Sequence, residues 1–211
     1  MDINKLEKEF KDGWTEIYKP LNEKRDKARE NISLRKKINH KIGREFKKYF
    51  ENFINNKLLR KNYSILETKN LPKIVKYDLK NKFDFVIISN NNSNNISALI
   101  KIRSHGIFWP SSFTQKVLQK HKEYVDGRTK LAKKFNAKLF LISFKDRKTY
   151  YIKMIPEFKK HNINLSDYYN FILYPSTKDE SNYDSYESNI NESAKNSEFE
   201  KFLTNFEKLF N

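Results

Sequence analysis

The spacing of apolar residues between positions 40 and 155 changes from helical to extended and back, and this order constrains the fold most strongly. From His40 to Leu59, apolar side chains recur every three or four residues, as on the buried face of a helix. Segments with the composition of strands follow, separated by polar residues. They lie at Tyr63–Thr68, Phe83–Ser89 and Ile96–Arg103, with Asn90–Asn95 as a hairpin loop.

The pattern continues toward the C-terminus in the same way. A long helix is expected over residues 113–135, and Gly127 is expected to bend or divide it. A buried strand at Ala137–Phe144 and a hairpin strand at Thr149–Ile155 come next. The order helix, three strands, helix, strand predicts an α/β fold with an αβββαβ core and a mixed central sheet.

Apolar stripes at both ends of the chain predict an N-terminal and a C-terminal helix outside this core. The N-terminal stripe, which we expect Gly13 and Pro20 to interrupt, consists of Leu6, Phe10, Trp14, Ile17 and Tyr18. The C-terminal stripe consists of Phe199, Phe202, Leu203, Phe206, Leu209 and Phe210. Packing on the domain is the simplest role for both. Nucleic-acid contact is the alternative for the first, and a homodimer interface for the second.

Changes in composition divide the chain into four parts. Residues 1–39 form an N-terminal helical arm, and residues 40–175 form the α/β core. Residues 176–197 are rich in Ser and Asn and acidic, which is typical of a flexible polar linker. Residues 198–211 are the C-terminal amphipathic helix.

The chain is strongly basic, and the charge is unevenly distributed. It has 43 Lys and Arg against 26 Asp and Glu, a formal net charge of +17. Residues 176–211 contain eight acids and four bases, so residues 1–175 carry +21. An AT-rich genome, which favours Lys and Asn, is an alternative source for part of the excess, but it accounts less readily for this asymmetry. The first partner that the charge suggests is nucleic acid, whose phosphates Lys and Arg neutralise.

Composition excludes several classes of site. The absence of cysteine excludes disulfides and thiolate-bound metals. Four glycines are too few for a glycine-rich phosphate loop, and four scattered histidines lack the spacing of metal ligands. The N-terminus lacks an apolar signal segment and no apolar run reaches 18 residues, so we expect a cytoplasmic protein that does not enter a membrane.

Two of the predicted strands carry charged residues in places where burial disfavours them. Asp84 stands inside the otherwise apolar segment Phe83–Ile88, which Lys82 precedes, and a carboxylate there needs a partner or a metal. Lys101 and Arg103 lie two residues apart in the next strand, so they share one of its faces. We expect that face to look toward Asp84.

The order of elements and these strands resemble the PD-(D/E)XK nuclease superfamily, which includes many type II restriction endonucleases and Holliday-junction resolvases. The resemblance covers residues 40 to 155 and implies a restriction-endonuclease-like core. In that family an Asp and an (Asp/Glu)-x-Lys tripeptide hold Mg²⁺ and activate water. The resemblance therefore implies that Asp84 is a catalytic residue and a metal ligand, with Mg²⁺ as cofactor if the protein is an active endodeoxyribonuclease.

The tripeptide departs from the family pattern. Lys101 stands where the family has a carboxylate, and Arg103 stands where it has Lys. A cation beside the site opposes metal entry, and Arg is a poor base because its pKa stays above about 12. Other carboxylates that can complete a catalytic site are Glu45, Asp78 and Glu123, with Lys116 or Lys120 in place of the missing Lys.

We therefore predict a DNA-binding protein, most simply for duplex DNA, with an altered active site. The residues expected to contact DNA are Lys101, Arg103, His105, Gln115, Lys116, Gln119 and Lys120. Three hypotheses stay open at this point. The chain is a restriction-endonuclease-like enzyme, a non-catalytic DNA-binding or regulatory module on the same fold, or a protein-interaction subunit.

Overall fold

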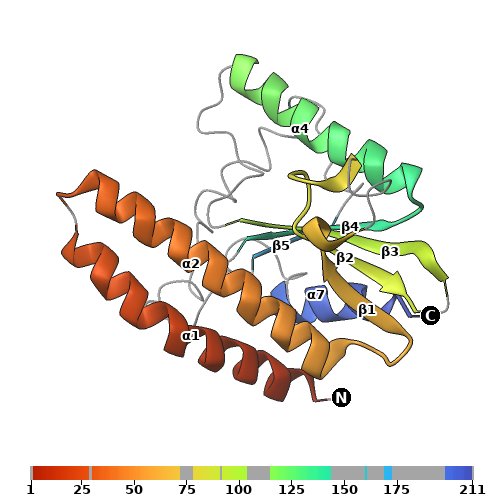
Figure 1. Ribbon diagram of the computed structural model, residues 1–211, viewed down its shortest axis with the longest axis horizontal. Coiled ribbons are helices and arrows are strands. Elements are labelled where there is room, and N and C mark those ends of the chain that lie inside the picture. Colours follow the sequence, from red (N-terminus) through yellow and green to blue (C-terminus); the bar gives the residue numbers. More distant parts are fainter. Residues whose placement is uncertain are drawn as a thin grey trace.

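A five-stranded sheet forms the centre of the computed structural model, which describes residues 2–28, 30–71, 78–90, 92–103, 115–143, 160, 169–172 and 198–210 (Figure 1). In spatial order the strands are β1 (Tyr63–Glu67), β2 (Phe85–Ser89), β3 (Asn92–Arg103), β4 (Lys138–Ser143) and β5 (Tyr169–Ile172). The pairs β1–β2 and β2–β3 are antiparallel, whereas β3–β4 and β4–β5 are parallel. The fold is α/β with a mixed sheet, as predicted.

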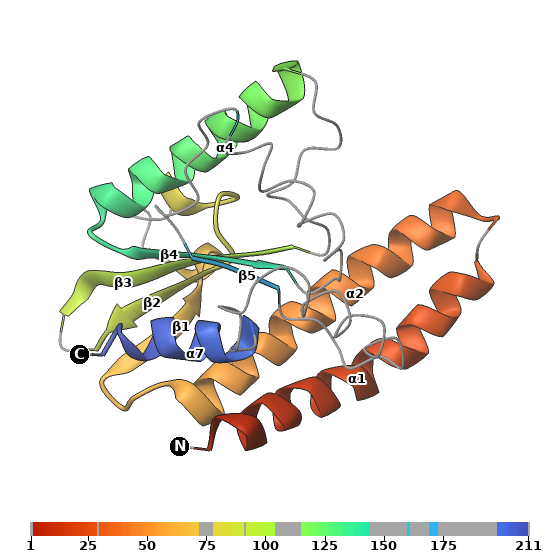
Figure 2. The same ribbon diagram turned by 180° about the vertical axis from the view of Figure 1, so that it is seen from behind.

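Helices cover both faces of the sheet. The helices α1 (Ile3–Lys27), α2 (Ile32–Phe53) and α7 (Glu198–Glu207) lie on one face, and α4 (Gln115–Lys134) lies on the other (Figures 1 and 2). The helix α4 also supplies the crossover that the parallel pair β3–β4 requires. A π-helical turn, η1 (Ile54–Leu58), ends α2, and a 3₁₀ turn, η2 (Thr68–Asn70), follows β1.

Side-chain alternation along the strands creates a core on each face of the sheet. Phe85 and Ile87 of β2 point toward the α1, α2 and α7 face, whereas Val86 points toward the α4 face. In β3, Ile100 belongs to the first core and Leu99 to the second. Because successive side chains of a strand point to opposite faces of the sheet, neighbouring apolar residues of these segments enter different cores.

Both terminal helices pack on the domain, as their apolar stripes predicted. Trp14 of α1 is fully buried, and its ring lies 4.9 Å from that of Phe46 in α2. Phe10 lies 5.1 Å from Phe199 of α7, so α1 and α7 also contact each other. The apolar faces of both helices are thus used inside this chain.

The helix α1 is continuous, contrary to the prediction that Gly13 and Pro20 interrupt it. Leu21 and Trp14 are buried on either side of Pro20, and this packing outweighs the cost of about 3 kcal/mol for a proline inside a helix. Gly13 allows a close approach: a Cβ at this position would lie 2.7 Å from the Tyr49 hydroxyl oxygen of α2. Gly127 does not divide α4 either.

The Tyr49 hydroxyl occupies a fixed position between the two helices. It donates a hydrogen bond of 2.8 Å to the carbonyl of Phe10. Burial, followed by the nearby carboxylates Asp12 and Glu16, raises the pKa of Tyr49 to about 12. The hydroxyl therefore keeps its proton and remains a donor at physiological pH.

The first core helix begins earlier than expected. The helix α2 starts at Ile32, and the side chain of Asn31 accepts a hydrogen bond of 2.9 Å from the Leu34 N–H to cap it. It runs without a break across the division that the sequence placed between residues 39 and 40. The stretch before His40 lacks a regular apolar face, because Ile32 and Leu34 are exposed beyond the core.

Two strands also differ from the prediction. The strand β3 already begins at Asn92 and pairs there with Ser89, so much of the expected loop Asn90–Asn95 is strand. Irregular register at Ile87–Ser89 admits this pairing. The four-residue strand β5 was not predicted, because it is too short for a clear period. The predicted strand Thr149–Ile155 and the linker 176–197 lie outside the described residues.

We predict opposite effects for alanine at Gly13 of α1 and at Gly127 of α4. Gly13→Ala brings a methyl group against the Tyr49 hydroxyl and should lower the free energy of unfolding by about 1–3 kcal/mol. Gly127→Ala meets no atom within 4 Å and should raise it by up to about 1 kcal/mol, because Ala favours helices. Urea denaturation followed by circular dichroism measures both, and equal stabilisation by the two changes would contradict the close approach.

Candidate functional site

Asp84 lies immediately before β2, and its backbone is fixed on both sides. Its N–H donates to the carbonyl of Ile100 in β3 at 2.8 Å, and its own carbonyl accepts from the N–H of Thr68 in η2 at 3.0 Å. The buried Thr68 hydroxyl donates to the preceding carbonyl, that of Phe83, at 2.8 Å. These bonds hold the carboxylate at the end of the sheet.

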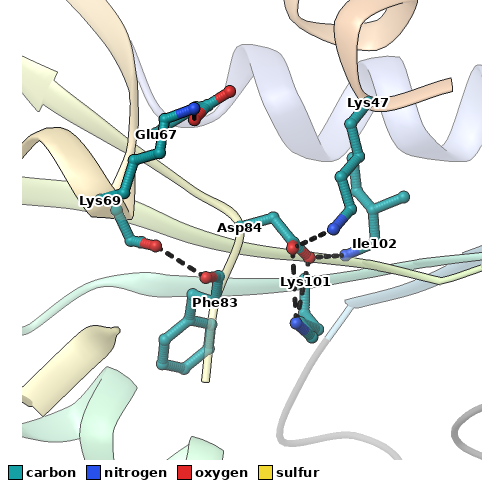
Figure 3. A network of polar contacts seen from close by, with 8 residues as sticks. Lys47, Glu67, Lys69, Phe83, Asp84, Lys101 and Ile102 are labelled. Atoms are coloured by element: carbon teal, nitrogen blue, oxygen red, sulfur yellow. Dashed lines mark hydrogen bonds and ion pairs between the residues drawn. The ribbon is translucent and has the colours of Figure 1, made fainter. Parts of the chain in front are cut away.

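The Asp84 carboxylate is surrounded by donors from two elements (Figure 3). The ammonium group of Lys47, from α2, lies 2.6 Å from Oδ1. The ammonium group of Lys101, from β3, lies 3.3 Å from Oδ2, and the Ile102 N–H donates to the same oxygen at 2.8 Å. Only 11% of the Asp84 side chain and 10% of the Lys101 side chain are exposed, against 37% for Lys47.

Local strand geometry explains why an acid is stable at this position. Because β2 begins at Phe85, the Ile102 N–H of the longer strand β3 lies beyond the end of its neighbour. The Asp84 carboxylate supplies the missing acceptor. Its remaining lone pairs then accept from the two ammonium groups, so the buried charge is paired and hydrogen-bonded.

A basic cleft of about 530 Å³ opens beside Asp84. The described residues that line it include six cations and two carboxylates, a net charge of +4. The cations are Arg44, Lys47, Lys48, Lys69, Lys80 and Lys101, and the carboxylates are Glu67 and Asp84. Glu67 forms an ion pair with Lys69, and this hydrogen bond raises the pKa of Lys69. Such a surface attracts anions.

The structure brings together two of the residues that the sequence singled out. Asp84 and Lys101 are in contact, as the alternation in the strands predicted. The backbone of Arg103 pairs with Ser143 of β4. The side chains of Arg103 and Gln115, and the whole of His105, lie outside what the structure describes.

The predicted residues on α4 lie elsewhere. The side chains of Lys116, Gln119 and Lys120 are exposed, and none of the three lines the cleft. Gln119 donates a hydrogen bond of 3.1 Å to the exposed Glu123, so this carboxylate has a partner within its own helix.

The two other candidate carboxylates also lie outside the lining of the cleft. Glu45 lies 4.0 Å from the Lys48 ammonium group, one turn further along α2. Asp78 forms a hydrogen-bonded ion pair with Lys134 of α4, which lowers the pKa of Asp78. Both carboxylates are therefore paired away from Asp84.

Several cleft residues were not identified from the sequence. Lys47 matters most, because it joins α2 to the end of the sheet. Arg44, Lys47 and Lys48 share one side of α2 at spacings of three and four residues, and this helical spacing is the signal that points to them. Lys69 and Lys80 lie in turns that carry no comparable pattern.

Comparisons with known proteins leave the family open. The chain matches no protein-family model, and no curated protein or solved structure is significantly similar to it. The resemblance to PD-(D/E)XK nucleases therefore stays a prediction. Among the described helices, none has the length and apolar character that crossing a membrane requires.

The described residues around Asp84 do not fit a divalent metal. Mg²⁺ takes oxygen ligands, whereas the Asp84 carboxylate is already in contact with two ammonium groups, those of Lys47 and Lys101. No group of three metal-ligating side chains occurs in the described part of the chain. A metal at this carboxylate would also meet two ammonium groups that lie within 3.4 Å of its oxygens. The donor set suits an anion instead.

We predict that Asp84→Ala lowers the free energy of unfolding by about 3 kcal/mol, because the Lys101 ammonium stays buried without the Asp84 charge. Lys101→Met should cost less, since Asp84 keeps Lys47 and the Ile102 N–H. Asp78→Ala, which removes a carboxylate from an exposed ion pair, is the matched control and should have a much smaller effect. Equal losses for Asp84→Ala and Asp78→Ala in urea denaturation would refute the proposed role of the network.

Proposed function

We propose that this chain is a DNA-binding protein with a restriction-endonuclease-like core, and that its basic cleft holds the phosphodiester backbone of a duplex without hydrolysing it. The observation that carries the proposal is the arrangement at Asp84, where one carboxylate orients two ammonium groups at the wall of a cleft with a net charge of +4. An anionic polymer is the ligand that this charge favours.

The cationic residues of the cleft contribute to phosphate binding in different ways. Lys47 is partly exposed, so its ammonium protons can reach a phosphate oxygen while Asp84 holds the side chain in place. Lys101 is nearly buried and adds fixed positive charge behind it. Arg44, Lys48 and Lys80 are exposed and supply further contacts that release counterions from the polyanion.

The aromatic residues of the cleft favour a duplex over a single strand. Proteins that bind single strands commonly stack bases on exposed aromatic rings. Among the described residues that line this cleft, the aromatic rings are those of Phe83 and Phe85, which are 2% and 1% exposed. Neither offers a face to a base, so the described cleft suits the backbone of a stacked helix.

The same geometry argues against metal-dependent hydrolysis. In the family that the sequence resembles, two carboxylates hold the metal that activates water. Here the position of the second carboxylate is occupied by Lys101, and Glu45, Asp78 and Glu123 are paired elsewhere. The non-catalytic module is therefore the hypothesis that the charges support.

We predict that removing cleft cations flattens the salt dependence of DNA binding. The triple change Arg44→Gln, Lys48→Gln and Lys80→Gln should reduce the slope of log affinity against log salt by about 2–3, because each lost phosphate contact removes about 0.9. The triple change Lys5→Gln, Lys8→Gln and Lys208→Gln removes equal charge from exposed positions outside the cleft lining. Fluorescence anisotropy with a duplex measures both slopes, and equal changes would mean that the cleft has no special role.

We predict further that binding needs no divalent metal and produces no cleavage. Adding EDTA to the purified protein should leave its affinity for a duplex unchanged, because the cations in contact with phosphate are side chains. Plasmid incubated with Mg²⁺ or Mn²⁺ should stay intact, as gel electrophoresis would reveal. Cleavage that disappears in Asp84→Asn would instead establish a metal-dependent endonuclease and overturn the non-catalytic assignment.

A further inference from the structure

The outer face of α2 carries a line of cations that continues beyond the cleft. Lys37, Lys41, Arg44 and Lys48 follow one another at intervals of four, three and four residues. At 3.6 residues per turn these positions fall within about 60° of one another around the helix. They lie opposite the buried side, to which Phe46 belongs. We call these four residues the basic stripe.

The basic stripe is continuous with the cleft at one end and leaves it at the other. Arg44 and Lys48 line the cleft, whereas Lys37 and Lys41 do not. The helix α2 extends well past the edge of the sheet, and both views show it running outward together with α1 (Figures 1 and 2). The distance along the axis from Lys37 to Lys48 is about 16 Å at 1.5 Å per residue.

The charge of the stripe is exposed and poorly compensated. Lys37, Lys41, Arg44 and Lys48 are all exposed. Over its length α2 has seven Lys and Arg against two Glu. Within the described residues, no carboxylate lies within ion-pairing distance of Lys37, Lys41 or Arg44, and Lys48 has only Glu45 at 4.0 Å. Four exposed cations along one side of a helix repel one another, and a bound polyanion would neutralise this repulsion.

We propose that the basic stripe is a second part of the DNA-binding surface, along which the duplex continues after leaving the cleft. This inference rests on the proposed function and adds a location and an extent to it. About 16 Å corresponds to roughly five base-pair steps, since each strand carries one phosphate per 3.4 Å of helix axis. A rigid helix presents its cations at fixed intervals, which suits a stiff, regular polyanion.

Lysine footprinting tests where the DNA lies. The full chain is acetylated with and without a duplex of about 24 base pairs, long enough to span cleft and stripe, and each lysine is followed by mass spectrometry. Lys37 and Lys41 should be protected together with the cleft lysines Lys48 and Lys80, whereas Lys5 and Lys8 on α1 should stay reactive. Protection of Lys48 and Lys80 without Lys37 and Lys41 would overturn the inference and leave the proposed function standing. No protection at any of these lysines would overturn both.

Substitution gives an independent measure of the same contacts. Lys37→Gln with Lys41→Gln should weaken binding of the long duplex about tenfold at low salt, as expected for the loss of two phosphate contacts. Lys5→Gln with Lys8→Gln removes the same charge and should change the affinity much less. Equal losses in the two double variants would overturn the stripe, because net charge would then explain the effect.

Discussion

The ion pairs of Asp84 are the interaction on which the arrangement of this protein depends. They join α2 to the end of the sheet through Lys47, and they hold β3 beside the start of β2 through Lys101 and the Ile102 N–H. A nearly buried carboxylate is costly unless its charge is paired. Lys47 belongs to α2 and Lys101 to β3, and both line the cleft. The ion pairs of Asp84 therefore also fix the position of this helix relative to this strand at the cleft.

The helix α2 connects the stability of the domain with its surface charge. Its inner side places Phe46 and Phe50 in the aromatic core that α1 and α7 complete. Its outer side carries the basic stripe, and between the two sides Lys47 reaches Asp84. Rotation of the helix to improve one of these contacts would disturb the others. The core packing therefore acts on the cleft by holding its cations in a fixed direction.

Much of the fold was predictable because it follows from local periodicity. The strands β1 to β4 are apolar segments bounded by polar residues, and α4 repeats its apolar residues at helical spacing, so each was located within a few residues. The contact between Asp84 and Lys101 was also predictable, since an acid in an apolar strand needs a partner and a neighbouring strand offered a cation. The contact of Lys47 with Asp84 was missed because the two residues lie 37 positions apart in the sequence, and a local pattern does not predict a contact over such a separation. The first turns of α2 were expected to be helical but were assigned to the N-terminal arm, because they cover no core.

A bound metal can promote hydrolysis of a phosphodiester, whereas fixed ammonium groups can only bind it. A divalent metal strongly lowers the pKa of its bound water and so creates a nucleophile beside the phosphorus. An ammonium group donates hydrogen bonds and neutralises charge, but it does not convert a neighbouring water into hydroxide at neutral pH. In the proposed function, the presence of Lys101 where the resembled family has an acid therefore does more than remove a metal ligand. Under this proposal, Lys101 permanently provides the positive charge that the metal would bring, so the protein keeps its affinity for the DNA backbone without a metal to activate water.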